Sequence, residues 1–169
     1  MQINSKIHFI GISGIGMSGI AELMLDKGYS IQGSDISVND NTKRLKKKGI
    51  KFFLGHNKKN IKNAQAIVYS SAIKKNNPEI REAYIKKIPV LSRADMLSEL
   101  MKNKKSIAIA GSHGKTTTTS LVGNIFNEAG LDPTIVNGGI INSFSNNNRY
   151  GKGEWMIVEA DESDGTFLK

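Results

Sequence analysis

The stretch Lys6-Ile-His-Phe-Ile10, followed by Gly11-Ile-Ser-Gly14-Ile-Gly16-Met-Ser-Gly19, decides the fold of the N-terminal half. Its first five residues are mostly apolar and predict a buried strand, and Met17–Lys27 has the apolar spacing of a helix. A glycine turn between a strand and a helix leaves backbone N–H groups at a helix N-terminus, where the helix dipole favours an anion. The stretch therefore predicts the first strand–helix unit of a phosphate-binding α/β domain.

Strand and helix patterns continue to alternate after this unit. The expected strands are Tyr29–Gly33, Ile50–Leu54, Ala66–Ser70 and Pro89–Leu91, and the expected helices are Asn41–Lys48, Glu79–Lys87 and Arg93–Met101. Such alternation is typical of a parallel sheet with helices on both faces. We predict a Rossmann-like α/β domain over residues 1–103.

A second glycine loop opens a new unit after the polar stretch Lys102–Lys105. It follows the apolar strand Ser106–Ala110, precedes a helix over Lys115–Ala129, and reads Gly111-Ser112-His113-Gly114-Lys115-Thr116-Thr117. This is a shortened form of the phosphate loop G-x-x-x-x-G-K-[ST], since Ile109 stands where the common form has its first glycine. The lysine of such a loop contacts the β- and γ-phosphates, and its hydroxyl residue, here Thr116, holds Mg²⁺. We predict an ATP site here, at the start of a P-loop-type α/β ATPase domain over residues 104–169.

The strand predicted over Trp155–Ala160 brings acidic side chains to the edge of the second sheet. Ligands of α/β sheets bind at the carboxyl ends of the strands, and Mg²⁺ takes carboxylate oxygens together with phosphate oxygens. Glu159 is therefore the predicted metal ligand, and Asp161 remains open between a ligand and a solvated loop residue. A strand is expected at Thr134–Val136 and an exposed loop at Asn142–Tyr150. Three strands would leave this sheet incomplete, so the chain is expected to be a portion of a longer protein.

Composition narrows the classes of protein. The 169 residues carry a formal net charge of +9 and contain no cysteine, so neither disulfides nor thiolate metal sites are expected. The lysines form short groups without interleaved aromatic residues, which favours a solvated basic exterior over a nucleic-acid surface. No apolar run has the length of a membrane span, and the N-terminus lacks the features of a signal peptide. We expect a cytoplasmic protein that binds neither nucleic acid nor membrane.

The first loop admits two ligands. Gly14-x-Gly16-x-x-Gly19, with Asp35 about 20 residues further on, matches the dinucleotide fingerprint and would suit an NAD-binding oxidoreductase domain. A nucleotide-sugar diphosphate would use the same amides. The additional Gly11 and the second nucleotide loop favour the nucleotide-sugar.

The three histidines receive different predictions. His113 lies inside the second loop and is open between a ligand contact and a neutral loop side chain. His8, within a strand, is expected to be packed, and His56 receives no role from its position in the sequence.

Several segments together resemble the Mur ligase family. In chain order they are Gly11–Glu22, Gly33-Ser-Asp35, Ser70-Ser-Ala-Ile73, Asn77-Pro-Glu79, Arg93-Ala-Asp-Met-Leu97, Gly111–Thr117, Val136-Asn-Gly-Gly139 and Glu159-Ala-Asp-Glu-Ser-Asp164. Among the members, the resemblance is to those that join L-alanine to UDP-N-acetylmuramic acid with ATP and Mg²⁺ through an acyl phosphate. A sibling that attaches a preformed peptide to the same UDP-sugar is the alternative. Members are more than twice this length, so the resemblance implies that this chain alone is inactive and leaves its oligomeric state open.

The resemblance also assigns site residues. Lys115 would be catalytic, Thr116 and Glu159 would hold the metal, and residues 111–117 would bind ATP. The UDP-sugar would be bound by Gly11, Gly14, Ile15, Gly16, Met17, Ser18, Asp35, Ser70, Ser71 and Ala72.

Overall fold

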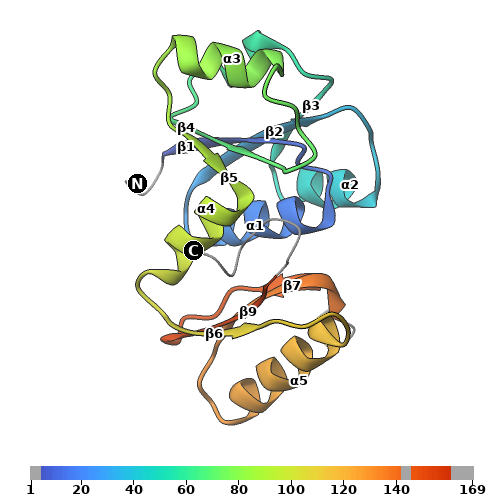
Figure 1. Cartoon of the computed structure of the whole chain (residues 1–169), viewed down its shortest axis with the longest axis vertical. Helices are drawn as coiled ribbons and strands as arrows, with labels where there is room; N and C mark the ends of the chain where they lie inside the picture. The colour runs from blue at the N-terminus through green and yellow to red at the C-terminus, as the bar shows by residue number, and fades with distance from the viewer. Residues whose placement is uncertain (1–4, 142–145, 161–169) are drawn as a thin grey trace. The chain divides into compact units, whose positions relative to one another are not determined.

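The computed structural model describes residues 5–141 and 146–160. The chain forms two compact units, Met1–Arg93 and Ala94–Lys169. Each unit is built on one sheet, as Figure 1 shows. The domain boundary expected at 103/104 remains a prediction.

The first unit has the predicted alternation of strands and helices. Its elements are β1 (Lys6–Ile10), α1 (Ile15–Asp26), β2 (Ser30–Asp35), α2 (Asp40–Lys47), β3 (Lys51–Leu54), the short 3₁₀ helix η1 (Lys58–Ile61), β4 (Ala66–Tyr69), α3 (Pro78–Ile85) and β5 (Val90–Ser92). The strands are all parallel, in the order β3-β2-β1-β4-β5. From β1 the chain first adds β2 and β3 on one side, and then adds β4 and β5 on the other side. The direction in which strands are added therefore reverses between β1 and β4. Ligands of such sheets bind outside the carboxyl ends of the strands at this point.

Apolar side chains fill both faces of the first sheet. Helices α1 and α2 lie on one face and α3 on the other (Figure 1). Phe9 in β1 and Ile20 in α1 are fully buried. On the side of α3 and η1, one core cluster contains Ile10, Ile61, Ala64, Ile67, Ile80 and Ala83. The predicted Rossmann-like α/β class is confirmed.

One close approach in this sheet requires glycine. Gly33 of β2 pairs with Phe9 of β1. A β-carbon at Gly33 would lie 2.7 Å from the carbonyl oxygen of Phe9 and 2.9 Å from Cβ of Ile12, the fully buried residue within the first glycine loop. The absence of a side chain at Gly33 therefore lets the loop pack directly on the second strand.

Lysines cover the outer strand β3. The ammonium of Lys46 lies 5.0 Å from the ring centre of Phe52, and that of Lys51 lies 5.0 Å from the ring centre of Phe53. Both distances are within the range of cation–π attraction. The two aromatic side chains are half-buried under these lysines.

The second unit contains α4 (Arg93–Met101, with Arg93 assigned to the first unit), β6 (Lys105–Ile109), α5 (Lys115–Glu128), β7 (Thr134–Ile141), β8 (Asn146–Arg149) and β9 (Trp155–Glu159). The strand order is β6-β9-β7-β8, with β6, β9 and β7 parallel and β8 antiparallel to β7. Phe126 of α5 meets Trp155 of β9 edge to face, with ring centres 5.1 Å apart. Across the described ranges, no helix has the length and apolar character needed to cross a bilayer.

The prediction of a loop at Asn142–Tyr150 is wrong for residues 146–149, because these residues form β8. Its sequence, Asn-Asn-Asn-Arg, has low strand propensity, and the strand exists because it pairs with β7. Arg149 donates to Asp132 Oδ1 at 2.6 Å and to the carbonyl of Pro133 at 3.1 Å, which ties the strand to the start of β7. The second sheet accordingly has four strands among the described residues instead of three.

Candidate functional site

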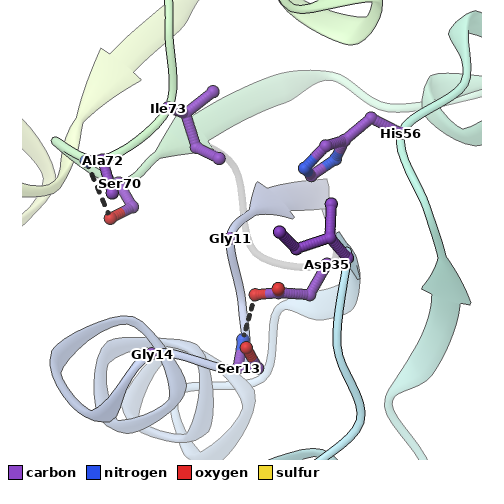
Figure 2. Close-up of a pocket in the computed structure, with 9 residues that line it drawn as sticks. Gly11, Ser13, Gly14, Asp35, His56, Ser70, Ala72 and Ile73 are labelled. Atoms are coloured by element: carbon purple, nitrogen blue, oxygen red, sulfur yellow. Dashed lines mark hydrogen bonds between the residues drawn. The ribbon is translucent and has the colours of Figure 1, made fainter.

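A pocket of about 230 Å³ opens at the carboxyl ends of the strands of the first sheet. It is lined by Gly11, Ser13, Gly14, Asp35, Ile36, His56, Ser70, Ala72 and Ile73 (Figure 2). Asp35 is the last residue of β2, and the others come from the segments that follow β1, β2, β3 and β4. The pocket thus lies where the strand order reverses.

The first glycine loop is held by backbone bonds and leaves its helix end open. The N–H of Gly11 donates to the carbonyl of Ser34 at 2.9 Å, and Gly11 has a φ of +80°, in the region that favours glycine. Gly14 is the N-cap of α1, and no side chain of the described residues caps it. Free N–H groups in the first turn of α1 therefore suit a phosphate.

The carboxylate of Asp35 fixes the glycine loop. Its Oδ2 accepts from the N–H of Ser13 at 2.9 Å, and its Oδ1 accepts from the N–H of Ser37 at 3.3 Å. Figure 2 shows the bond to Ser13 at the wall of the pocket. Asp35 is 8% exposed, and its bond to Ser13 holds the loop against the end of β2.

Half of the residues predicted for the UDP-sugar line this pocket. Gly11, Gly14, Asp35, Ser70 and Ala72 are among its lining residues, whereas Ile15, Gly16, Met17, Ser18 and Ser71 are not. Met17 and Ser18 are buried within α1, and the Ser18 hydroxyl donates to the carbonyl of Ile15 at 2.9 Å. Their assignment to ligand binding remains a prediction.

Sequence reasoning missed four lining residues, Ser13, Ile36, His56 and Ile73. His56 is the most informative, because its imidazole is the largest polar group among the four. It follows β3, and the edge shared by parallel strands was the one signal that could have placed it here.

A buried carboxylate adjoins His56. Glu79, at the start of α3, is fully buried. Its Oε2 accepts from the Ser34 hydroxyl at 2.6 Å and lies 3.3 Å from Nε2 of His8. His8 is fully buried, which confirms the packed histidine expected in the first strand.

The hydrogen bonds to Glu79 lower its pKa more than burial raises it. Burial by itself would raise the pKa of the carboxyl, but the hydrogen bond and charge attraction of His8 act against it. Further hydrogen bonds from Ser34 and Asn60 contribute, and the pKa of Glu79 lies below its usual 4.5. The folded state therefore holds this carboxylate in its ionised form.

The lowered pKa of Glu79 predicts a loss of stability in acid. A carboxyl whose pKa is lower in the folded state stabilises the fold above its unfolded pKa, and this contribution is lost as pH falls through the folded pKa. We expect the free energy of unfolding to decrease as the pH is lowered past about 4.5. The decrease should be smaller in Glu79→Gln than in the unaltered chain. Urea unfolding followed by circular dichroism at pH 7 and pH 3.5 measures the difference. Equal losses in both proteins would contradict the prediction.

The second glycine loop also precedes an open helix end. Gly111 and Gly114 have φ of +148° and +77°, and no side chain of the described residues caps Gly114 at the start of α5. Ser112, His113 and Thr117 are exposed, while Lys115 is half-buried with its ammonium donating to the carbonyl of Gly111. The loop therefore combines free helix N–H groups with one cation.

Thr116 and Glu159, the two predicted metal ligands, lie together. The Thr116 hydroxyl donates to the carboxylate of Glu159, 3.0 Å from Oε2 and 3.3 Å from Oε1. The neighbouring parallel strands β6 and β9 cause this approach, because Ile109 pairs with Glu159. Oxygen donors of this kind fit Mg²⁺. Asp161, Glu162 and Asp164 lie outside the described residues.

Sequence reasoning gave no role to Asn137, which follows Val136 in β7. Its amide donates to the carbonyl of Thr116 at 3.2 Å and to the hydroxyl of Ser120 at 3.0 Å. Its Oδ1 is buried and has no partner among the residues that the structure describes. This side chain therefore braces the first turn of α5.

Comparison with known proteins identifies the family. The sequence profile of the Mur ligase family, catalytic domain, matches residues 6–105, which is more than half of the chain. The chain belongs to the Mur ligase family.

Relatives and solved structures extend this likeness to nearly the whole chain. It is 59% identical over 163 residues to the UDP-N-acetylmuramate–L-alanine ligase of Methylobacterium sp. (strain 4-46), covering 96% of this chain and 35% of that protein. It is 61% identical over 164 residues to the ligase of the same name from Parvibaculum lavamentivorans, covering 97% of this chain and 33% of that protein. The Mur ligase chain therefore spans about a third of the length of these relatives.

Solved structures of Mur ligases have a similar fold. The UDP-N-acetylmuramate–alanine ligase of Thermotoga maritima superposes with a TM-score of 0.87 at 35% identity, covering 94% of this chain and 37% of that one. The UDP-N-acetylmuramate:L-alanyl-γ-D-glutamyl-meso-diaminopimelate ligase of Neisseria meningitides superposes with a TM-score of 0.87 at 26% identity, covering 95% and 53%. These similarities show that the likeness to Mur ligases in fold extends over nearly the whole chain.

Proposed function

We propose that this Mur ligase chain is the N-terminal portion of an ATP-dependent ligase that joins L-alanine to UDP-N-acetylmuramic acid. The observation that carries the proposal is the presence in one chain of two uncapped glycine loops with different surroundings. One opens on a pocket of about 230 Å³, and the other combines Lys115 with the oxygen pair of Thr116 and Glu159. The names of the relatives from Methylobacterium and Parvibaculum support the same substrates.

The first loop is the proposed site of the UDP-sugar. The N–H groups at the start of α1 would bind the diphosphate, and the pocket walls at Asp35 and at Ser70–Ala72 would contact the nucleotide end. A nicotinamide dinucleotide would use the same amides, but an oxidoreductase has no use for a second loop of the phosphate type.

The second loop is the proposed site of ATP. Transfer of the γ-phosphoryl group to the substrate carboxylate turns a poor electrophile into an acyl phosphate, which the amine of L-alanine attacks with release of phosphate. The transferred group spreads negative charge over its oxygens, and Lys115 would neutralise that charge. Mg²⁺, when bound, supplies further positive charge at the phosphates. Thr116 and Glu159 would hold it.

The sibling ligase that attaches a preformed peptide is the second candidate. The Neisseria structure and the Thermotoga L-alanine ligase both superpose with a TM-score of 0.87, because the two ligases share this part of the fold. The fold therefore supports both candidates equally. The first glycine loop and the 59% identity to an L-alanine ligase favour the first candidate. Both reactions would use a UDP-sugar and ATP, so the cytoplasm is the proposed location of the protein.

Glu159→Gln is expected to weaken the dependence on Mg²⁺. The amide keeps the size and one oxygen but removes the charge that attracts the cation, so half-maximal activity should require about tenfold more Mg²⁺. The measurement uses a chimeric ligase in which residues 1–169 replace the matching segment of the Methylobacterium relative. Glu154→Gln is the matched control, since its exposed carboxylate pairs with Lys105 at the other end of β9. An unchanged Mg²⁺ requirement in Glu159→Gln would remove the metal role.

Calorimetry with UDP-N-acetylmuramic acid and, separately, with NADH tests the proposal on the 169-residue chain. Heat with the UDP-sugar alone is expected, and binding of NADH alone would overturn the proposal in favour of a dehydrogenase-type domain. We expect no L-alanine-dependent phosphate release from this chain by itself, because the relatives that carry the activity in their names are about three times as long.

A further inference from the structure

Glu79 has no part in the proposed function, although it belongs to the Asn77-Pro-Glu79 segment that the sequence singles out. Its carboxylate is completely buried and has several polar partners on each oxygen. Oε1 accepts from the Asn60 amide at 2.7 Å and from the N–H of Asn57 at 3.2 Å. Oε2 lies 3.3 Å from Nδ1 of His56, the histidine in the pocket wall. The carboxylate thus reaches the substrate site through one side chain.

The network determines which nitrogen of His56 carries a proton. The Ser34 hydroxyl has one proton and donates it to Glu79 at 2.6 Å. The same hydroxyl oxygen lies 3.0 Å from Nδ1 of His56, so at this contact it can only accept. Both neighbours of Nδ1 are therefore acceptors, and Nδ1 must be the protonated nitrogen.

Because Nδ1 carries the proton and faces Glu79 and Ser34, Nε2 is the side-chain nitrogen of His56 that can meet a ligand. The imidazole is 14% exposed and lines the pocket. In Figure 2 the ring points into the space bordered by Asp35 and Ile73. In the neutral ring with Nδ1 protonated, Nε2 accepts a hydrogen bond. The group that it suits is a hydroxyl or N–H donor, as a nucleoside provides.

We propose that Glu79 is a positioning residue of the substrate pocket, which holds the His56 ring in its Nδ1-protonated form and presents Nε2 as an acceptor to the nucleoside. This inference rests on the proposed function in taking UDP as the ligand. In the part of the chain that the structure describes, the titratable groups near His56 include Glu79 from α3, His8 from β1 beyond that carboxylate, and Asp35 at the end of β2.

Nitrogen-15 NMR of the histidine-labelled 169-residue chain at pH 8 tests the tautomer directly. We expect His56, assigned by comparison with His56→Ala, to show a protonated Nδ1 and an unprotonated Nε2, and added UDP to shift Nε2. A protonated Nε2 in the neutral ring would overturn the inference. This result needs no variant of Glu79 that folds.

A double-mutant cycle measured by UDP calorimetry separates positioning from a purely structural effect. His56→Ala and Glu79→Gln should each weaken UDP binding about tenfold, the effect of one hydrogen bond. In the His56→Ala background, Glu79→Gln should change the affinity by less than about twofold, because the residue through which it acts is gone. Equal losses in both backgrounds would mean that Glu79 acts on the fold and not through His56.

Glu82→Gln is the matched control, with the same change on the same helix. Glu82 pairs with Lys86 at 3.0 Å and is not among the residues that line the pocket, so UDP affinity should remain unchanged. Failure of the unaltered chain to bind UDP would count against the proposed function itself. Normal UDP binding with the other tautomer, or with additive losses, would count against the role of Glu79 alone.

Discussion

Lys115→Ala is expected to lower the turnover of the chimeric ligase by about 10³-fold, the cost of removing a preorganised charge from a transferring group. Lys115 is the only cationic side chain within the second glycine loop, whose other members are glycines, hydroxyl residues and His113. Its ammonium lies over the loop, where it contacts the carbonyl of Gly111. Substitution by alanine leaves the backbone N–H groups of α5 in place, so the loss should appear mainly in kcat.

The same variant should bind UDP-N-acetylmuramic acid with an affinity within about twofold of the unaltered protein, since sites that share no partner act independently. The pocket belongs to the first compact unit and Lys115 to the second. Lys102→Ala serves as the control, because Lys102 is an exposed partner of Glu99 outside both loops. Survival of full turnover in Lys115→Ala would remove the ATP site from this loop.

Gly33→Ala is expected to lower the free energy of unfolding of the first unit by about 3 kcal/mol, at the upper end of the usual cost of overpacking. The added methyl group would meet the carbonyl oxygen of Phe9 at 2.7 Å, and backbone in the middle of a sheet has little room to move. It would also meet the side chain of Ile12 and so displace the first glycine loop. Urea unfolding followed by circular dichroism measures the loss, and hydrogen exchange of β2 amides assigns it to this sheet.

Gly49→Ala separates crowding from backbone strain. Gly49 has a φ of +84°, but a β-carbon there would have no atom within 4 Å. Its replacement should therefore cost only the strain of the left-handed conformation, about 1 kcal/mol. If Gly49→Ala costs as much as Gly33→Ala, the close approach between β1 and β2 is not what requires glycine at position 33.

Local patterns were sufficient for most elements of the fold. The strand at Lys6–Ile10 and the helix at Arg93–Met101 have the predicted bounds, and other elements differ by a few residues at their ends. The two misses, η1 and β8, share a cause. Lys58–Ile61 and Asn146–Arg149 are polar segments whose structure depends on partners elsewhere in the chain, such as β7 for β8. Such partners leave no mark in the local sequence.

The candidate sites likewise contain residues with a local sequence signal and residues whose position depends on partners elsewhere in the chain. The positions of the glycine loops and of Glu159 at strand ends could be predicted, because a spacing of a few residues or an apolar strand pattern carries the signal. His56 and Glu79 could not, since their function depends on a contact between residues 23 positions apart, bridged by the hydroxyl of Ser34. The histidine follows β3 and the carboxylate opens α3, and only the order of strands in the sheet brings these elements to one edge.

The lysines that lie over the aromatic rings of β3 also affect the association of this protein with other copies of itself. β3 is an outer strand of its sheet, and an outer strand offers unpaired N–H and C=O groups with which another copy could pair. Such pairing would bring Lys46 and Lys51 of one copy against the same ammonium groups of the next, in a protein that already carries a net charge of +9. Cations that shield the aromatic rings within one molecule therefore repel a second molecule, and this edge resists aggregation at low ionic strength more than at high salt.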